Sequence, residues 1–131
     1  MNEKAEELKR RTAAFATAII DLCSRVPQSQ AGRHISKQLI EAATAVSSNY
    51  RAACRGRSKA EFAAKIGTAT EEADECCRWL KLLVDNRLLT QEQSANLLQE
   101  AGELTAILNA SQKTARRNLR RRQSSIKSSI T

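Results

Sequence analysis

Basic side chains are the groups most capable of chemistry in this sequence of 131 residues, and they gather in two places. Along a predicted helix, four cations fall within about 60° of one another at 100° per residue. Segment 112–131 carries seven more cations and no acid. Guanidinium groups engage phosphate oxygens bidentately, so both places predict contacts with a nucleic-acid backbone. The predicted nucleic-acid-binding residues are Arg33, Lys37, Arg51, Arg55, Arg57, Lys113, Arg116, Arg117, Arg120, Arg121 and Arg122.

The same cations also have a purely structural explanation. Most charged helix faces are only solvated, and cations near the C-terminus of a helix stabilise it by about 0.3–1 kcal/mol. Seven cations exceed that need, and the formal net charge of +8 favours an acidic partner. Sequence-specific reading of bases is not predicted, because no helix-turn-helix, zinc-finger or RNA-recognition signature is present.

The sequence contains no catalytic or metal-binding constellation. Its one histidine, His34, lacks the glutamate three residues earlier that a di-iron bundle requires, and cannot alone complete a triad. The four cysteines lack the CxxC spacing of zinc sites, which predicts small packed side chains. The acids Glu71, Glu72, Asp74 and Glu75 spread round a helix and favour pairing with basic residues of another subunit. We therefore expect no enzyme, no metal and no cofactor.

The N-terminal residues are charged where a signal peptide needs an apolar core. No apolar run approaches the roughly 18 residues of a membrane span. The sequence therefore predicts a cytoplasmic protein without a membrane partner.

Apolar residues recur at alternating steps of four and three, the pattern of amphipathic helices. We call such a line of apolar residues along one side of a helix a seam. The first seam runs from Leu8 to Val26 and is followed by Pro27, which ends a helix. Two further seams predict helices at residues 30–55 and 59–85, and a fourth seam ends at Leu108. Four such helices joined by short connections bury their seams together as an antiparallel up-down-up-down bundle, so the predicted fold class is all-α.

Residues 1–111 are expected to form this bundle. Segment 112–131 is expected to continue the fourth helix and then to end in a disordered tail, because it is polar and basic. An alternative arrangement is a pair of long helical hairpins that complete their core through a second chain. Apolar residues outside the minimal seams indicate a second apolar face and a homo-oligomer.

Several single residues are predicted to have structural roles. Ser58 and Glu61 form a capping box, and Phe62 follows on a seam. Trp79 stands one residue before a seam, which favours burial between helices or between subunits. Asn49 occupies a seam position, where an amide fixes helix register, as buried Asn does in coiled coils. A pocket at Asn49 and its neighbour Tyr50 is the less favoured interpretation.

Several short motifs occur in a fixed order around the second and third helices. They read Gln38-Leu39, Asn49-Tyr50-Arg51-Ala52, Arg57-Ser58, Glu61-Phe62, Glu71-Glu72-x-x-Glu75 and Trp79-Leu80. Over residues 8–110 the chain resembles the four-helix-bundle proteins encoded in intervening sequences of bacterial 23S ribosomal RNA genes, the ribosomal S23-like family. That family also resembles the accessory variability determinant of diversity-generating retroelements.

The resemblance implies a ring-like homo-oligomer, a pentamer, with a cationic surface that binds nucleic acid or a reverse transcriptase. The sequence departs from the commoner family pattern, in which the asparagine is followed by Ile, Ala, Glu and Gly. Here Asn49 precedes Tyr-Arg-Ala-Ala, and the lost acid adds to the positive charge of the second helix. Residence in a ribosomal gene insert does not imply binding to the ribosome.

The leading functional hypothesis is a non-enzymatic, oligomeric bundle that binds RNA or DNA through phosphate contacts. The alternative is a protein-interaction scaffold, such as an accessory subunit to a reverse transcriptase, whose basic surfaces meet an acidic protein. A complex with a partner protein that survives nuclease treatment would favour the scaffold hypothesis over nucleic-acid binding.

Overall fold

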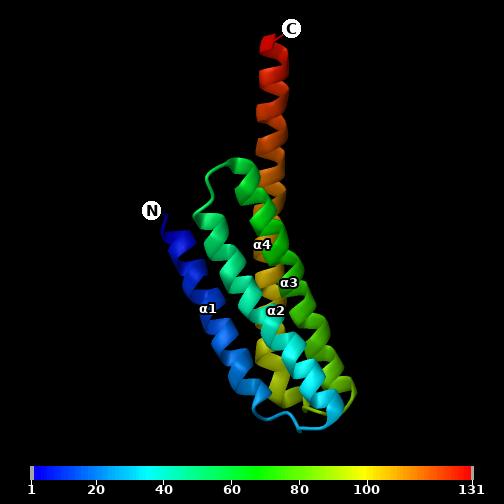
Figure 1. Ribbon diagram of the computed structural model, residues 1–131. Helices are drawn as coiled ribbons and strands as arrows, with labels where there is room; N and C mark the ends of the chain where they lie inside the picture. Colours follow the sequence, from blue (N-terminus) through cyan, green and yellow to red (C-terminus); the bar gives the residue numbers. More distant parts are fainter. Residues whose placement is uncertain (1, 131) are drawn as a thin grey trace.

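The computed structural model describes residues 2–130, and within that range it contains four α-helices and no strand. The helices are α1 (Glu3–Cys23), α2 (Gln30–Cys54), α3 (Lys59–Asp85) and α4 (Gln91–Ile130). Successive helices run in opposite directions, and the second half of α4 stands clear of the other three (Figure 1). The all-α four-helix bundle predicted from the seams is confirmed.

The helix boundaries follow local capping signals. Thr90 and Gln93 bond reciprocally, with the Gln93 N–H donating to the Thr90 hydroxyl at 3.1 Å and the Thr90 N–H donating to the Gln93 side chain at 2.9 Å. The Glu61 N–H likewise donates to the Ser58 hydroxyl at 3.0 Å. The Glu61 carboxylate, however, accepts from the N–H of Arg57 at 3.3 Å, one residue before the helix cap. The predicted capping box therefore has one regular half and one displaced half.

The core combines a few large side chains with many small ones. Ile19, Leu39, Ile66, Leu80 and Leu104 are fully buried, one or more from each helix. Buried alanines lie between them on all four helices and allow the helix axes to approach closely; they are Ala16, Ala42, Ala43, Ala53, Ala63, Ala69, Ala73 and Ala101. The Ala-rich seams of the sequence thus form one continuous core.

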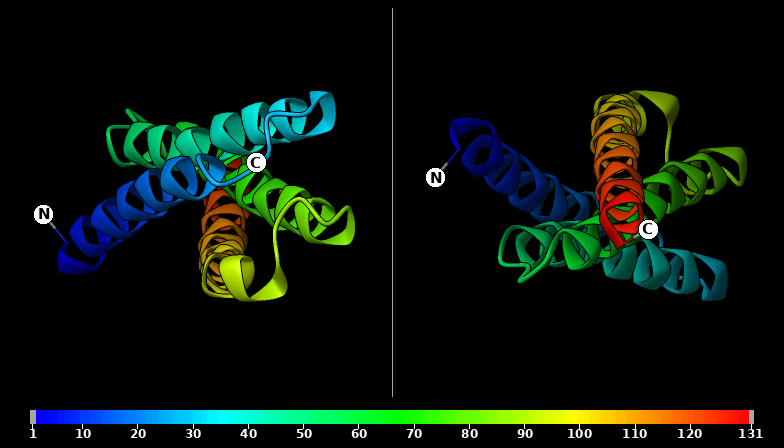
Figure 2. Two further views of the ribbon diagram at one scale, coloured as in Figure 1. Left: turned by 90° about the horizontal axis from the view of Figure 1, so that it is seen from below. Right: turned by 90° about the horizontal axis from the view of Figure 1, so that it is seen from above.

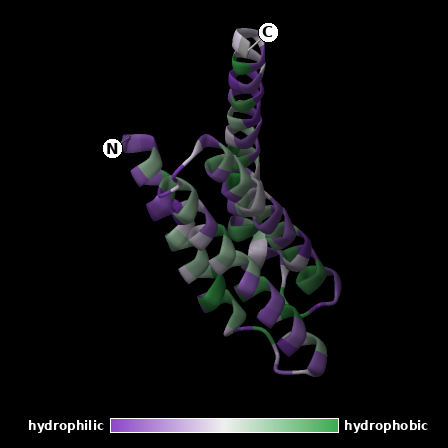
Figure 3. Cartoon of the chain, turned by 45° about the horizontal axis from the view of Figure 1, so that its top comes forward, coloured by the Kyte–Doolittle hydropathy of each residue, from purple (hydrophilic) through white to green (hydrophobic). Residues whose placement is uncertain are grey.

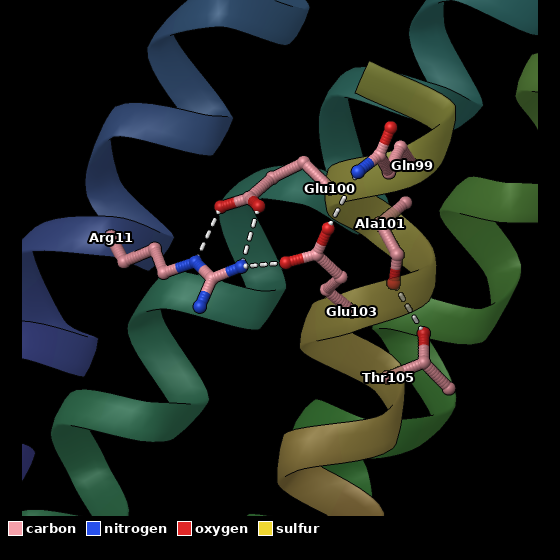
Figure 4. A network of polar contacts seen from close by, with 6 residues as sticks. All are labelled: Arg11, Gln99, Glu100, Ala101, Glu103 and Thr105. Carbon is pink, nitrogen blue, oxygen red and sulfur yellow. Dashed lines mark hydrogen bonds and ion pairs between the residues drawn. The ribbon is translucent and has the colours of Figure 1, made fainter. Parts of the chain in front are cut away.

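Helix α1 is tied to α4 by a charged network at mid-height (Figure 4). The Arg11 guanidinium donates to both carboxylate oxygens of Glu100 at 2.7 Å and to Glu103 at 2.8 Å. Hydrogen bonds donated by Gln99 and Arg11 lower the pKa of Glu103, and the hydrogen bonds that Glu100 accepts from Arg11 raise the pKa of Arg11. Beyond this network α1 and α4 diverge towards the N-terminus of α1 (Figures 1 and 2).

Helix α4 continues past residue 111, as the sequence predicts, and it runs without a break to Ile130 through the last residues, for which the sequence predicts disorder. No glycine or proline follows Gly102, and Ala, Leu, Arg, Gln and Lys favour helix. We call residues 112–130 the α4 extension. Hydrophilic residues predominate along the extension, with a few hydrophobic ones between them (Figure 3).

Candidate nucleic-acid interface

The α4 extension presents its cations on one side. At 100° per residue, Lys113, Arg116, Arg117, Arg120 and Arg121 fall within an arc of about 140°, and all five are exposed. Successive pairs, 116–117 and 120–121, are about 6 Å apart along the axis at 1.5 Å per residue. Because the extension contains no acid, these five side chains form a continuous row of ammonium and guanidinium donors about 12 Å long. We call it the cation row.

More cations lie at the end of the bundle from which the extension projects. Arg51 and Arg55, in the last turn and at the end of α2, are exposed there. Arg57, in the α2–α3 connection, lines a cleft together with Lys59 and Arg122. Sequence reasoning missed Lys59 as part of this cationic end, although its alternation with Arg55 and Arg57 around the turn could have indicated it.

The other half of the predicted α2 ridge lies far from this end. Arg33 and Arg55 are separated by about 33 Å along the helix axis. Arg33 donates to the backbone carbonyl of Gln28 at 2.6 Å, and it shares a shallow groove between α1 and α2 with Lys37 and the acid Glu41. The ridge predicted from the sequence therefore divides into two separate cationic places, and only the one at Arg51 and Arg55 adjoins the extension.

The cleft has a volume of about 1450 Å³. It opens between the first turns of α1 and the part of α4 that follows Ile107. Its floor is formed by Tyr50, Ala53, Cys54 and Phe62. Tyr50 is only 6% exposed, and burial, followed by its contact with Cys54, raises the pKa of its hydroxyl. The cleft therefore has an apolar floor and a charged rim.

The aromatic side chains do not lie along the cation row. Trp79 is half-buried on α3, donates to the Glu75 carboxylate at 2.9 Å, and meets the His34 ring edge-on at a centroid distance of 6.2 Å. Phe62 is half-buried at the cleft floor. The α4 extension contains no Phe, Tyr or Trp, so it offers no aromatic platform on which a base could stack.

Asn49, for which the sequence predicts a role in fixing helix register, makes a hydrogen bond within its own helix. Its side-chain amide donates at 2.9 Å to the carbonyl of Ala45 on the same helix, and the residue is half-buried. The short side chain of Asn49 reaches the backbone carbonyl one turn earlier in α2, so its amide bonds within that helix. Of the pair considered for a pocket, Tyr50 lines the cleft and Asn49 does not.

The remaining polar candidates occupy ordinary structural positions. Cys23 and Cys76 are buried, Cys54 and Cys77 are half-buried, and all four are free thiols. On α3, Asp74 pairs with Arg78 at 2.5 Å, while burial and the neighbouring Glu75 and Glu71 raise the pKa of Glu72. Among residues 2–130, His, Cys, Asp and Glu nowhere gather in threes around a possible metal position. Nor is any helix of that range both long and apolar enough to cross a membrane.

The geometry defines a four-helix bundle with a cationic end, and comparison with known proteins gives its family. Residues 4–110 match the family model described as 23S rRNA-intervening sequence protein. The chain therefore belongs to that family. The match ends at residue 110, so the α4 extension lies outside it.

A solved structure supports the same assignment. It is a protein of unknown function from the S23 ribosomal protein family of Bacteroides thetaiotaomicron, and it is 29% identical to this chain. The two superpose with a TM-score of 0.77 over 84% of this chain and 98% of the other. Among curated proteins, none matches this chain.

Proposed function

We propose that this protein is a non-enzymatic, homo-oligomeric four-helix bundle that binds RNA or DNA through phosphate contacts. The observation that carries the proposal is the cation row, in which five exposed Lys and Arg side chains share one side of the acid-free α4 extension. Arg51, Arg55, Arg57 and Lys59 extend the positive surface onto the end of the bundle. Such a surface recognises charge and shape rather than base sequence.

The bundle holds the first half of α4 rigidly, and the α4 extension carries the cation row beyond the bundle. Helix α4 is one continuous element from Gln91 to Ile130, so its packed first half fixes the direction of its exposed second half. A straight helix with pre-set cations loses less conformational entropy on binding than a disordered tail would. The ordered extension therefore favours phosphate binding over a merely solubilising tail.

The first experiment is light scattering coupled to size exclusion, with and without a pool of duplex DNA and structured RNA at ~0.15 M salt. The expected result is a discrete oligomer of the 14.5 kDa chain whose mass increases when nucleic acid is added. A discrete oligomer that ignores both nucleic acids would instead favour the protein-interaction scaffold, for example an accessory subunit to a reverse transcriptase. A monomer would contradict the assembly.

A further inference from the structure

The cleft lies at the end of the bundle where α1 and α4 separate (Figure 2). At mid-height the ion pairs of Arg11 hold these two helices together, and beyond them the helices diverge. One large or medium-sized apolar side chain from each helix remains accessible in the cleft: Leu8, Cys54 and Phe62 are half-buried, and Ile107 is 38% exposed. Within residues 2–130, no further element covers this apolar surface.

Small side chains on α4 keep the cleft open. At 100° per residue, Ile107, Ser111, Thr114 and Asn118 fall within about 60° of one another, and all four line the cleft. The last three are small, so the middle of this wall carries no bulky side chain. The cation row occupies a different arc of the same helix. The cleft and the cation row are therefore separate surfaces.

The charge around the cleft is positive. Its lining contains five cations and two acids, a net charge of +3. Arg11 is paired with Glu100 and Glu103. Glu7 is paired with Arg10 at 2.8 Å. The other charged lining residues are all exposed; they are Lys4, Arg57, Lys59, Arg122 and Glu3. Four exposed cations therefore stand round the apolar surface against one acid.

This combination selects the chemistry of a partner. A nucleic-acid backbone would contact the cations and leave the apolar surface without a partner. The α4 extension of a second copy contains no acid, so its charge opposes that of the cleft. A helix with one apolar face and acids beside that face is complementary to both parts of the cleft.

The dimensions of the cleft suit such a helix. An α-helix with its side chains is about 11 Å across, so the cleft volume of about 1450 Å³ corresponds to about ten helical residues, or about 15 Å of helix. The α1 wall from Glu3 to Arg11 is about 12 Å long at 1.5 Å per residue, and the α4 wall from Ile107 to Arg122 is about 22 Å long. A helix of that length is therefore flanked on both sides over most of its length.

We propose that the cleft binds an acidic amphipathic helix of a partner protein. The partner helix lies between α1 and α4, where its apolar face meets Leu8, Phe62 and Ile107 and its acids pair with the exposed cations. The inference goes beyond the proposed function and does not depend on it, because none of the five residues of the cation row lines the cleft.

The probe is a fluorescein-labelled peptide of about 14 residues, with Leu along one helical face and Glu and Gln along the other. Its control contains the same residues in an order that spreads Leu round the helix, so the two peptides have equal charge. Fluorescence anisotropy at ~0.15 M salt is expected to show at least about 10-fold tighter binding of the amphipathic peptide. Equal binding of the two peptides, or binding of neither, would overturn the proposal.

A blocking variant locates the contact. Thr114 is exposed on the cleft wall, and Thr114→Trp places a bulky side chain in the space beside it. Thr44→Trp makes the same substitution at an exposed position of α2 outside the cleft. Thr114→Trp is expected to weaken binding of the amphipathic peptide at least about 10-fold, and Thr44→Trp to leave it within about twofold. Equal effects of the two variants would place the peptide elsewhere and refute the docking site.

Reversing the charge beside the cleft tests the acidic character of the partner. Arg57→Glu together with Lys59→Glu places acids at the start of α3, where the helix dipole favours them, so the fold is retained. This double variant is expected to bind the acidic peptide about 10-fold more weakly and to prefer a version with Lys in place of Glu. An unchanged preference for the acidic peptide would contradict the charge complementarity.

Duplex DNA separates this inference from the proposed function. Thr114→Trp retains every residue of the cation row, so its affinity for duplex DNA is expected to stay within about threefold of that of the parent chain. If this variant loses DNA binding as strongly as peptide binding, the cleft is a nucleic-acid site and the inference fails. If the parent chain binds the amphipathic peptide and not DNA, the inference stands and the proposed function fails.

Discussion

Replacing Arg116, Arg117, Arg120 and Arg121 together by Gln is expected to weaken nucleic-acid binding at least about 100-fold at 0.05 M salt. Each cation that contacts a phosphate releases a counterion, and this gain in free energy is largest at low salt. Gln retains high helix propensity and side-chain length, so the extension keeps its conformation while it loses its charge. Fluorescence anisotropy with a labelled DNA duplex and a labelled structured RNA measures the change.

A matched control separates the cation row from net charge alone. Arg10, Arg25, Arg78 and Lys81 are exposed on other parts of the bundle, and each of the first three pairs with an acid three or four residues earlier in the sequence. Changing these four to Gln lowers the net charge by the same amount. The control is expected to bind with nearly the affinity of the parent chain. Equal weakening in both variants would show that the overall charge, not the row, attracts nucleic acid.

Gly32→Ala is expected to lower the free energy of unfolding by about 2–3 kcal/mol. Gly32 lies in the first turn of α2, where a Cβ atom would collide with the backbone carbonyl oxygen of Pro27 and would stand 3.1 Å from Val26 Cγ1. The backbone cannot yield here without moving the α1–α2 connection. The Gly32 N–H also donates to the capping hydroxyl of Ser29 at 3.1 Å, so such a movement would weaken the helix cap as well.

Gly102→Ala provides the opposite control. A Cβ atom at Gly102 has no neighbour within 4 Å, and the residue lies in the middle of α4. Removing the flexibility of glycine there is expected to raise the free energy of unfolding by about 0.5–1 kcal/mol. Urea denaturation followed by circular dichroism, at one fixed protein concentration, measures both variants. A Gly32→Ala chain as stable as the parent would refute the collision.

The sequence was sufficient to predict most of the fold because its signals are local. Seam spacing placed four helices, and the bonds between Thr90 and Gln93 show that their caps follow the short motifs. The predicted end of α2 at Arg55 differs by one residue from the observed end at Cys54. Each of these features depends on residues within about one helical turn of one another.

Features that depend on distant residues were predicted poorly. The α2 ridge looks continuous on a helical wheel, yet the structure places Arg33 and Arg55 at opposite ends and sets Glu41 beside the former. The cleft joins Arg57 to Arg122, and no spacing in the sequence relates those positions. The continuation of the fourth helix past residue 111 was predicted, but its last residues were expected to be disordered because low hydrophobicity outweighed helix propensity in that interpretation.

The salt dependence of affinity tests whether the chain binds nucleic acid through phosphate contacts. The affinity of the full chain for a DNA duplex is measured by anisotropy between 0.05 and 0.3 M monovalent salt. Five or more phosphate contacts predict that log K falls with log salt with a slope of about −4.5 or steeper. A slope near zero, or no binding at 0.05 M salt, would contradict binding through phosphate contacts.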